Sequence, residues 1–208
     1  MEKLKSSLTN MALVLTIIAV VAGGVLASVN YVTAPQIEKI NADNLAAGIK
    51  KVMGSDDITV AAPIEHKATI AGKEKVLTVY GVKNAANENM GCAVQTSENG
   101  FGGELQVLVG FDPTGTILGY TILKHAETPG LGAKAGLWFQ PENGESRTVV
   151  GKNPGQCNFT VSKDGGDIDA ITASTITSRA FLLAIKNAYD EIFGNPDSTS
   201  GATAQAKK

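Results

Sequence analysis

The chain has 208 residues, which suits one domain of ordinary size together with a short additional segment. Apolar residues make up 43% of the chain, aromatic residues 5% and charged residues 18%, a composition typical of a globular protein and not of a disordered one. The formal net charge is −2, and the sequence has no basic stripe interleaved with aromatic side chains. We therefore expect no nucleic-acid partner.

Cysteine and histidine are scarce. Cys92 and Cys157 lie far apart and form no CxxC motif, so they predict neither a zinc site nor a dithiol redox site of that kind. A disulfide between them and two unpaired thiols are both compatible with the sequence. The two histidines, His66 and His125, are too few for a multi-histidine metal site.

An uncharged apolar segment lies near the N-terminus. Residues 11–29 read MALVLTIIAVVAGGVLASV, a run of 19 residues without a charge. As a helix this run would be roughly 28 Å long, close to the ~30 Å of a bilayer's hydrocarbon core. A buried core helix would normally show a polar stripe, and a cleaved signal peptide has a shorter apolar part of about 7–15 residues. We therefore predict a retained transmembrane helix over residues 11–32, in contact with membrane lipid.

The basic residues around this segment predict its orientation. Lys3 and Lys5 precede it, whereas Lys39 is the first basic residue after it. Because basic residues are enriched on the cytoplasmic side of membrane spans, we expect residues 1–10 in the cytoplasm. The remainder of the chain would then lie on the periplasmic, extracytoplasmic side of the inner (cytoplasmic) membrane.

The next segment predicts a second helix. Thr33 and Pro35 are typical of a helix start, and Gly54 of a helix end. Between them, apolar residues recur at helical spacing: Ile37, Ile40, Leu45, Ile49, Val52 and Met53. We expect an amphipathic linker helix over residues 33–55.

Residues 56–195 then predict one α+β domain with an antiparallel sheet and flanking helices. Strand-like stretches occupy residues 68–70, 76–82, 91–95, 105–111 and 116–123, and the last two flank the turn sequence Asp-Pro-Thr-Gly at residues 112–115. Residues 125–160 are rich in Gly, Pro and Asn, which predicts ordered loop. A final helix over residues 178–193 has one apolar face, formed by Phe181, Leu182, Ile185, Tyr189 and Ile192. The small, polar tail over residues 196–208 is expected to be disordered.

The most informative stretch is residues 169–178, Asp-Ala-Ile-Thr-Ala-Ser-Thr-Ile-Thr-Ser. It places five hydroxyl side chains directly before the final helix. One of them could serve simply as the N-cap, but one cap does not need five hydroxyls. A helix start offers free N–H groups and the positive end of the helix dipole, so a phosphate-binding site is the functional alternative.

This stretch resembles the flavinylation motif of covalent FMN proteins, in which Asp, two variable residues, Ser or Thr, Gly and Ala precede the acceptor threonine. The resemblance implies that Thr175 carries FMN through a phosphoester. Asp169 matches the leading acid and Thr172 the Ser/Thr position, and Thr177 and Ser178 match the hydroxyls that follow the acceptor.

The match departs from the motif at two positions. Ala173 and Ser174 stand where Gly-Ala is usual, and we still count Ser174 among the cofactor-binding residues. The usual glycine matters if the backbone at position 173 needs a positive φ angle.

A second motif, His-Ala-Glu-Thr-Pro-Gly-Leu-Gly, covers residues 125–132. Taken alone, His125 and Glu127 could be a base and its orienting carboxylate, or surface residues of a Pro-Gly turn. The motif closely resembles a signature of the same family, found in the G subunit of Rnf-type electron transport complexes and the C subunit of the sodium-translocating NADH:quinone reductase. The resemblance implies isoalloxazine contacts for Glu127, Thr128 and Leu131, and close backbone approach at Gly130 and Gly132.

Three residues nearby have weaker assignments. Trp138 and Phe139 could line the pocket, although core packing is the simpler explanation. Lys163 could contact the flavin or its phosphate, although a solvated surface lysine is the simpler explanation.

The length of the chain and the order of its motifs resemble the Rnf G subunit more than the quinone-reductase C subunit. The resemblance implies an electron carrier that is not catalytic alone, with partners in the other subunits of a membrane complex that couples electron flow between ferredoxin and NAD to ion movement. A separate flavin transferase would attach the FMN. A self-contained extracytoplasmic flavin reductase and a membrane-tethered binding or scaffold module without flavin are the alternatives.

Overall fold

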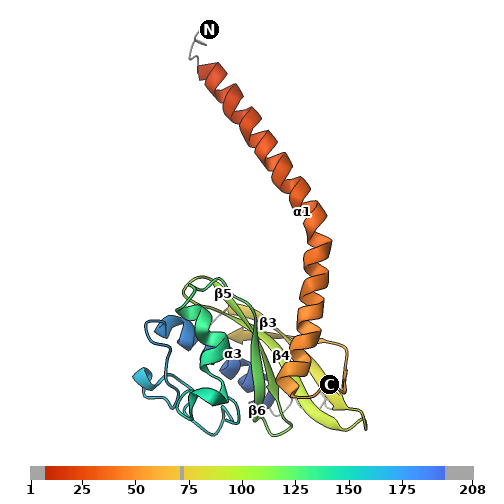
Figure 1. Ribbon diagram of the computed structural model, residues 1–208, viewed down its shortest axis with the longest axis vertical. Helices are drawn as coiled ribbons and strands as arrows, with labels where there is room; N and C mark the ends of the chain where they lie inside the picture. Colours follow the sequence, from red (N-terminus) through yellow and green to blue (C-terminus); the bar gives the residue numbers. More distant parts are fainter. Residues whose placement is uncertain (1–7, 71–72, 195–208) are drawn as a thin grey trace, which may run out of the picture. The chain divides into compact units, whose positions relative to one another are not determined.

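The computed structural model describes residues 8–70 and 73–194 (Figure 1). The predicted disordered tail, residues 196–208, and the first seven residues of the predicted cytoplasmic segment lie outside the described residues. The chain divides into two units, one ending at Asn44 and the other beginning at Leu45, and each is described by itself.

The first helix, α1, runs without a break from Leu8 to Met53. The predicted helix start at Thr33–Pro35 is therefore wrong. The Thr33 hydroxyl donates to the Val29 carbonyl at 2.9 Å, so it bonds back into the preceding turn instead of capping a new helix. Pro35 removes one backbone donor inside the helix, and the remaining hydrogen bonds maintain it. The helix ends at the predicted residue, because Gly54 adopts a φ of 65°.

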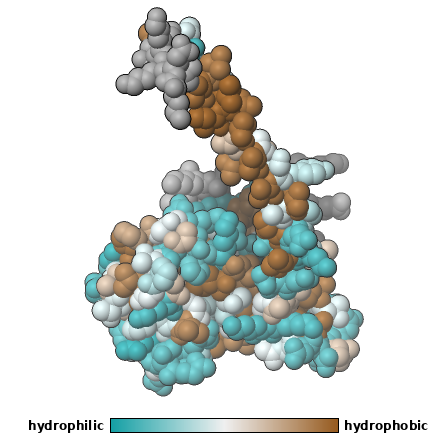
Figure 2. All heavy atoms as spheres, turned by 45° about the horizontal axis from the view of Figure 1, so that its top comes forward, coloured by the Kyte–Doolittle hydropathy of each residue, from teal (hydrophilic) through white to brown (hydrophobic). Residues whose placement is uncertain are grey.

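The N-terminal part of α1 is apolar on all sides and is long and apolar enough to cross a membrane. None of this apolar stretch is buried within the protein, and Figure 2 shows hydrophobic residues covering its surface. Its large side chains, such as Leu15, Val20 and Leu26, are more than half exposed. Exposed apolar surface on this scale is typical of a segment whose surroundings are lipid.

The second unit is built on one antiparallel sheet. Its strands are β1 (Ile58–Val60), β2 (Ile64–Ile70), β3 (Lys73–Asn84), β4 (Asn89–Asn99), β5 (Glu104–Phe111) and β6 (Ile117–Lys124). The order is β1-β3-β4-β5-β6, and β2 also pairs with β3. The predicted hairpin of β5 and β6 is confirmed. Its turn is held by the Asp112 carboxylate, which accepts hydrogen bonds from the amides of Thr114 at 2.8 Å and Thr116 at 2.9 Å.

One face of the sheet packs on the C-terminal helix α3 (Thr175–Phe193), and together they form the main core. Phe181 of α3 stacks on Phe139, with ring centroids 4.5 Å apart and planes 4° apart. Phe139 is fully buried, which confirms the core-packing interpretation for this residue. The helix begins at Thr175, earlier than the predicted Ser178, and its predicted apolar face packs in this core.

The last turns of α1 pack on the opposite face of the sheet. There, Ile49, Val52 and Met53 join a second apolar cluster with side chains from β3, β4 and β5. Gly110 and Gly119 are cross-strand partners, and a Cβ atom at either residue would lie within about 3 Å of the Val52 carbonyl oxygen. Two paired glycines therefore allow the helix backbone to approach the sheet closely.

The chain between β6 and α3 is mostly irregular, as predicted. It contains the short helices η1 (Gly132–Lys134), α2 (Ala135–Trp138), η2 (Pro141–Asn143) and η3 (Ser162–Asp164). Cys92 and Cys157 are both free thiols, which resolves the two alternatives in favour of unpaired cysteines. Burial raises the pKa of the Cys92 thiol to about 12.

Candidate functional site

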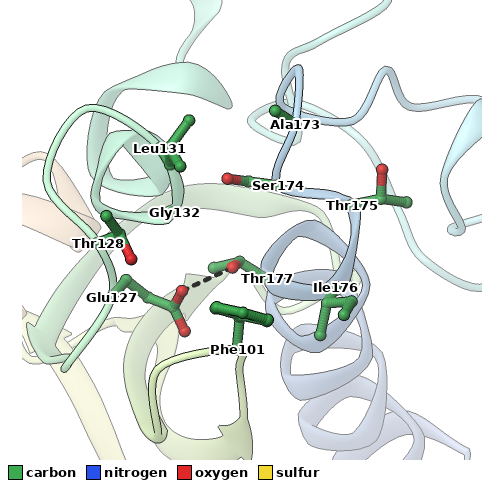
Figure 3. A pocket seen from close by; sticks show the side chains of 10 residues that line it. All are labelled: Phe101, Glu127, Thr128, Leu131, Gly132, Ala173, Ser174, Thr175, Ile176 and Thr177. Atoms are coloured by element: carbon green, nitrogen blue, oxygen red, sulfur yellow. Dashed lines mark hydrogen bonds between the residues drawn. The ribbon is translucent and has the colours of Figure 1, made fainter.

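A cavity of about 390 Å³ opens between the loop after β6 and the start of α3 (Figure 3). Three segments far apart in the sequence form it: the loop before β5, the predicted motif over residues 125–132, and the predicted motif over residues 169–178. Its lining residues are Phe101, Glu127, Thr128, Leu131, Gly132, Ala173, Ser174, Thr175, Ile176 and Thr177. The two predicted motifs therefore meet at one site of a size common for ligand pockets.

Glu127 forms the buried floor of this cavity and is only 6% exposed. Its carboxylate accepts a hydrogen bond from the Thr177 hydroxyl at 2.7 Å and another from the Gly102 amide at 3.1 Å. Within the described part of the chain, no ion pair to this carboxylate is present. Glu127 thus joins the loop after β6 both to α3 and to the loop before β5.

Glycines pack closely around this carboxylate. A Cβ atom at Gly100 or Gly132 would overlap a Glu127 carboxylate oxygen, and one at Gly132 would also lie 2.7 Å from the Thr177 hydroxyl. A side chain at either glycine would therefore displace a buried, hydrogen-bonded group. The prediction that Gly132 permits close approach corresponds here to approach between parts of the protein itself.

The opposite wall is the first turn of α3. Ser174 is its N-cap residue, yet the Ser174 side chain makes no capping hydrogen bond. The simple interpretation of the hydroxyls as a helix cap is therefore not what the structure shows. The first N–H groups of a helix have no carbonyl partner within the helix, so this turn offers donors and a positive dipole end to an anion.

Ala173, directly before the N-cap, has a φ of 62°. From the sequence, glycine is expected at this position if the backbone there has a positive φ, a conformation that glycine adopts without strain. An alanine in this conformation costs about 1–2 kcal/mol relative to its ordinary backbone conformations. The chain therefore has a strained residue directly before the start of α3.

Thr175 begins α3 at the edge of the cavity and is half-buried. In Figure 3 it lies across the cavity from Glu127 and Thr128. Its hydroxyl accepts a hydrogen bond from the Lys163 ammonium at 3.3 Å. The sequence allows Lys163 to be either a site residue or a solvated surface lysine. In the structure Lys163 contacts the predicted acceptor oxygen.

Other predicted site residues lie near the cavity without lining it. Ser178 is fully buried: its hydroxyl accepts from the Ile171 amide at 2.9 Å and donates to the Ser174 carbonyl at 3.0 Å. Thr172 is exposed, and Gly130 supplies a positive φ of 78° to its loop. These residues shape the two loops whose side chains reach the cavity.

Asp169 also lies outside the cavity, and its hydrogen bonds hold the loop before α3. Its carboxylate accepts a hydrogen bond from the Ser162 hydroxyl at 2.9 Å, and its carbonyl accepts one from the Trp138 indole at 3.0 Å. Hydrogen bonds from Ser146 and Ser162 lower the pKa of the Asp169 carboxyl below its usual range. Arg147 stacks on the Trp138 ring, 4.4 Å from its centroid, so Trp138 holds the loop on which Asp169 lies.

Besides Ala173, two lining residues were not predicted as site residues. Phe101 is 71% exposed and Ile176 is 52% exposed, and both present apolar surface at the cavity. Phe101 stands in a Gly-rich loop, where one exposed aromatic residue between glycines is the only signal that could have marked it. Ile176 is a similar case: it is an exposed apolar residue in the first turn of α3, where the hydroxyl residues Thr177 and Ser178 are buried.

The arrangement favours binding over acid–base or metal chemistry. The His125 imidazole accepts from the Glu127 backbone amide at 3.3 Å, while the Glu127 carboxylate bonds elsewhere, so the two side chains do not form a base–carboxylate pair. Among the described residues, no group of three or more His, Cys, Asp or Glu side chains could hold a metal ion. The site instead combines an apolar rim, a buried hydrogen-bonding floor and an anion-accepting helix start.

Comparison with known proteins agrees with this description. The FMN-binding domain family model matches residues 100–190, and the model of the RnfG N-terminal region matches residues 1–52. The chain is 37% identical over 186 residues to the G subunit of the Na(+)-translocating ferredoxin:NAD(+) oxidoreductase complex of Acetobacterium woodii, covering 84% of this chain and 86% of the relative.

A second relative, with lower identity, and a solved structure are similar as well. The G subunit of the ion-translocating oxidoreductase complex of Vibrio cholerae is 31% identical over 192 residues, covering 86% of this chain and 88% of the relative. The crystal structure of the C subunit of the Na(+)-translocating NADH-quinone reductase of Parabacteroides distasonis shares the fold, with a TM-score of 0.50 and 19% identity, covering 74% of this chain and 92% of that chain. The chain therefore belongs to the family of G subunits of Rnf-type ion-translocating oxidoreductase complexes.

Proposed function

We propose that this chain is the electron-carrier subunit of a membrane-bound ion-translocating ferredoxin:NAD oxidoreductase complex, and that it carries FMN through a phosphoester to Thr175. Family membership supports the carrier role and FMN as the cofactor. The observation that carries the covalent assignment is the position of Thr175. Its hydroxyl lies at the edge of the cavity, on the first turn of α3, within hydrogen-bond distance of a lysine ammonium.

The residues present fit a flavin. Leu131, Ile176 and Phe101 supply apolar surface suited to the flat faces of an aromatic ring system. Thr128 and the polar floor at Glu127 supply hydrogen-bonding groups for its heteroatom edge. The start of α3 and Lys163 supply donors and positive charge for a phosphate beside Thr175.

The chain's own residues would hold the flavin and set the polarity around its ring, while the flavin, when bound, supplies the redox chemistry. Thr175 makes retention independent of binding affinity, which matters for a carrier facing an open compartment. Glu127 fixes the relative positions of the two walls through its bonds to Thr177 and Gly102. Since electron transfer needs no general acid or base, a binding site without a catalytic triad suffices.

The anchor and the complex complete the proposal. Family membership and the apolar helix support a single-pass protein of the inner membrane, with the other subunits of the complex as partners. We place residues 1–10 in the cytoplasm, the span at residues 11–32, and the FMN-binding domain of residues 56–195 on the extracytoplasmic side, because Lys3 and Lys5 precede the span. Residues 33–55 would connect them. A separate flavin transferase would attach the cofactor.

The test is the covalent flavin itself. The full chain is co-expressed with a flavin transferase, run on a denaturing gel and viewed under ultraviolet light. The band of the wild-type chain should fluoresce, and its intact mass should exceed that of the polypeptide by one esterified FMN. Thr175→Ala should abolish the signal, because no other hydroxyl among the described residues has the same position at the edge of the cavity and beside Lys163.

Thr177→Ala should remain fluorescent, and Thr177→Ser, which keeps the hydroxyl bound to Glu127, serves as its folding control. Fluorescence retained by Thr175→Ala would show that the acceptor is another residue. A dark wild-type band with an unmodified mass, in cells shown to flavinylate a known substrate, would favour the scaffold alternative. Flavin-dependent reductase activity of the isolated chain would instead favour the self-contained reductase.

A further inference from the structure

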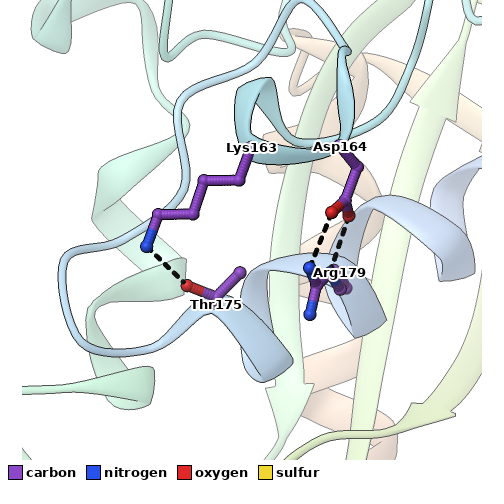
Figure 4. Close-up of polar contacts among 4 residues, drawn as sticks. All are labelled: Lys163, Asp164, Thr175 and Arg179. Atoms are coloured by element: carbon purple, nitrogen blue, oxygen red, sulfur yellow. Dashed lines mark hydrogen bonds and ion pairs between the residues drawn. The ribbon is translucent and has the colours of Figure 1, made fainter.

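We propose that Lys163 is a catalytic residue of flavin attachment within this chain, and that the ion pair between Asp164 and Arg179 positions it over the Thr175 hydroxyl (Figure 4). The inference rests on the proposed function, because it assigns the residues that prepare Thr175 as an acceptor. It assigns a task to three exposed charged side chains that lie beside the cavity but not on its floor.

The geometry begins with neighbouring residues on two elements. Lys163 and Asp164 are consecutive in η3, and Thr175 and Arg179 are four residues apart in α3. Residues with this spacing lie on the same face of a helix. The two elements therefore face each other through two parallel contacts: Lys163 to Thr175, and Asp164 to Arg179.

The second contact is the stronger one. The Asp164 carboxylate accepts from Arg179 Nε at 2.7 Å and from Arg179 Nη2 at 2.6 Å, a bidentate pair with a fixed relative orientation. Hydrogen bonds from Arg179 lower the pKa of the Asp164 carboxyl below its usual range, as expected for a paired carboxylate. Because Arg179 engages the acid next to Lys163, the lysine ammonium is directed to Thr175 instead of to its own neighbour.

The backbone of η3 supports this arrangement. Gly165 adopts a φ of 83° directly after η3, and the Ser162 amide donates to the Ile168 carbonyl at 2.8 Å. The Ser162 hydroxyl is further held by the Asp169 carboxylate. A long lysine side chain loses much rotamer freedom when it is fixed, so a rigid base close to its target reduces that cost.

The chemistry that Lys163 would assist is a phosphoryl transfer. The Thr175 oxygen forms a bond to the FMN phosphorus of a flavin dinucleotide, and the pyrophosphate P–O bond breaks. The nucleoside monophosphate leaves with the electron pair, and the hydroxyl proton passes to a base of the transferase. An ammonium on the threonine oxygen stabilises the negative charge that develops there and then lies beside the new phosphodiester.

The experiment measures the rate of attachment. The full chain is purified in detergent without flavin and incubated with purified transferase and flavin adenine dinucleotide, and covalent fluorescence is followed on denaturing gels. Removing one donor from an enclosed oxyanion site costs about 10²–10³ in rate, and an exposed ammonium should cost less, so we expect Lys163→Met to be roughly tenfold slower. Lys163→Arg, which keeps the charge, should recover most of the rate.

The positioning role has its own signature. Asp164→Asn and Arg179→Gln should each slow attachment roughly threefold in the wild-type background and have little effect in the Lys163→Met background, because both act through the lysine. Thermal unfolding of the flavin-free chain should change little in all three variants, since exposed ion pairs contribute little stability. Lys83→Met, which removes an exposed lysine of β3, is the control for the loss of one positive charge.

The outcomes separate the two proposals. Attachment to Lys163→Met within twofold of the wild-type rate would overturn the role of Lys163, while the loss of label in Thr175→Ala would leave the proposed function standing. Equal slowing by Asp164→Asn in both backgrounds would overturn the positioning role. A wild-type chain that takes up no flavin, beside a positive control substrate, would overturn the proposed function itself.

Discussion

On the side of β6, the cavity is bounded by a buried carboxylate whose two hydrogen bonds tie three segments of the chain together. On the side of α3, it is bounded by an uncapped helix start, a strained alanine and a half-buried threonine. Glu127 is 6% exposed and surrounded by glycines that leave it no space to move. The first wall therefore has one well-determined arrangement, whereas the second leaves polar groups open to an incoming molecule.

This difference suits the two tasks that the proposed function would require. A wall that holds a ring and tunes its surroundings benefits from packing and satisfied hydrogen bonds. A wall that must be modified by another enzyme needs an accessible hydroxyl and unsatisfied donors, even at some cost in stability. We call the side of the cavity around Glu127 and Gly132 the holding wall, and the side formed by residues 173–175 the accepting wall. Small steric changes should destabilise the holding wall. Substitutions that relieve backbone strain should leave the accepting wall equally stable or make it more stable.

The largest effect should follow from a single methyl group on the holding wall. In Gly132→Ala the new Cβ meets the Glu127 carboxylate and the Thr177 hydroxyl, so their buried 2.7 Å hydrogen bond must open. We expect the free energy of unfolding to fall by about 2 kcal/mol, measured by chemical denaturation of the flavin-free chain. Ordinarily, replacing a glycine of negative φ by alanine is stabilising.

Gly136→Ala is the matched control. A Cβ there meets only Ile122 Cδ1 at 4.0 Å, so this variant should gain about 0.5 kcal/mol from the lower backbone entropy of its unfolded state. If both variants changed the free energy of unfolding in the same direction, the packing around Glu127 would be looser than its contacts imply.

In the accepting wall, a substitution that relieves strain should raise the free energy of unfolding. Ala173→Gly removes the Cβ that disfavours the observed φ of 62°. Strain relief of about 1–2 kcal/mol is partly offset by the greater entropy of the unfolded chain, so stability should rise by about 0.5–1 kcal/mol. Flavin attachment should be at least as fast as in the wild-type chain, since glycine is usual here in the motif.

Ala86→Gly provides the contrast. It lies in an exposed turn after β3 without a positive φ, so the same substitution should destabilise by roughly 0.5 kcal/mol. Should Ala173→Gly lower stability as well, the strain assigned to the accepting wall would be absent.

The sequence predicted those parts of the molecule that depend on local chemistry. The hairpin around Asp112, the glycine end of α1 and the apolar face of α3 follow from turn residues and periodicity, and all are confirmed. The meeting of the two motifs was predicted from resemblance. The boundary at Thr33 was wrong because a threonine hydroxyl can bond back into its own helix as readily as it caps a new one.

What the sequence could not show depends on contacts between distant segments. The loop that carries Phe101 is tied to the cavity by the Glu127 carboxylate, which accepts from the Gly102 amide, and no local sequence pattern predicts that contact. Ser178 was predicted as a site hydroxyl, yet it is buried in α3 and bonds to the backbone of the segment directly before that helix. Whether a hydroxyl faces a ligand or its own backbone is decided by the direction of the helix, which the spacing of hydroxyls alone does not fix.

The smallest expected effect concerns the loop that supports the accepting wall. The pKa of the Asp169 carboxyl is lowered by hydrogen bonds from Ser146 and Ser162, so folding favours its ionised form. Its contribution to stability is therefore present above the ordinary pKa of about 4 and is lost as the pH falls through the lower pKa of the folded state. Asp169→Asn keeps an acceptor for Ser162 but loses the charge. We expect it to lower stability by about 0.5 kcal/mol or less at pH 7, because the group is largely solvated.

The pH dependence distinguishes this charge effect from a loss of packing. Denaturation of the wild-type chain and Asp169→Asn from acidic to neutral pH should give two curves that converge at the acidic end, where the carboxyl is protonated in both the folded and unfolded states. A gap that stays constant over the whole range would mean that the substitution disturbs the loop sterically. In that case Asp169 would support the loop before α3 through its backbone bonds to Ser146 and Trp138, and not through its charge.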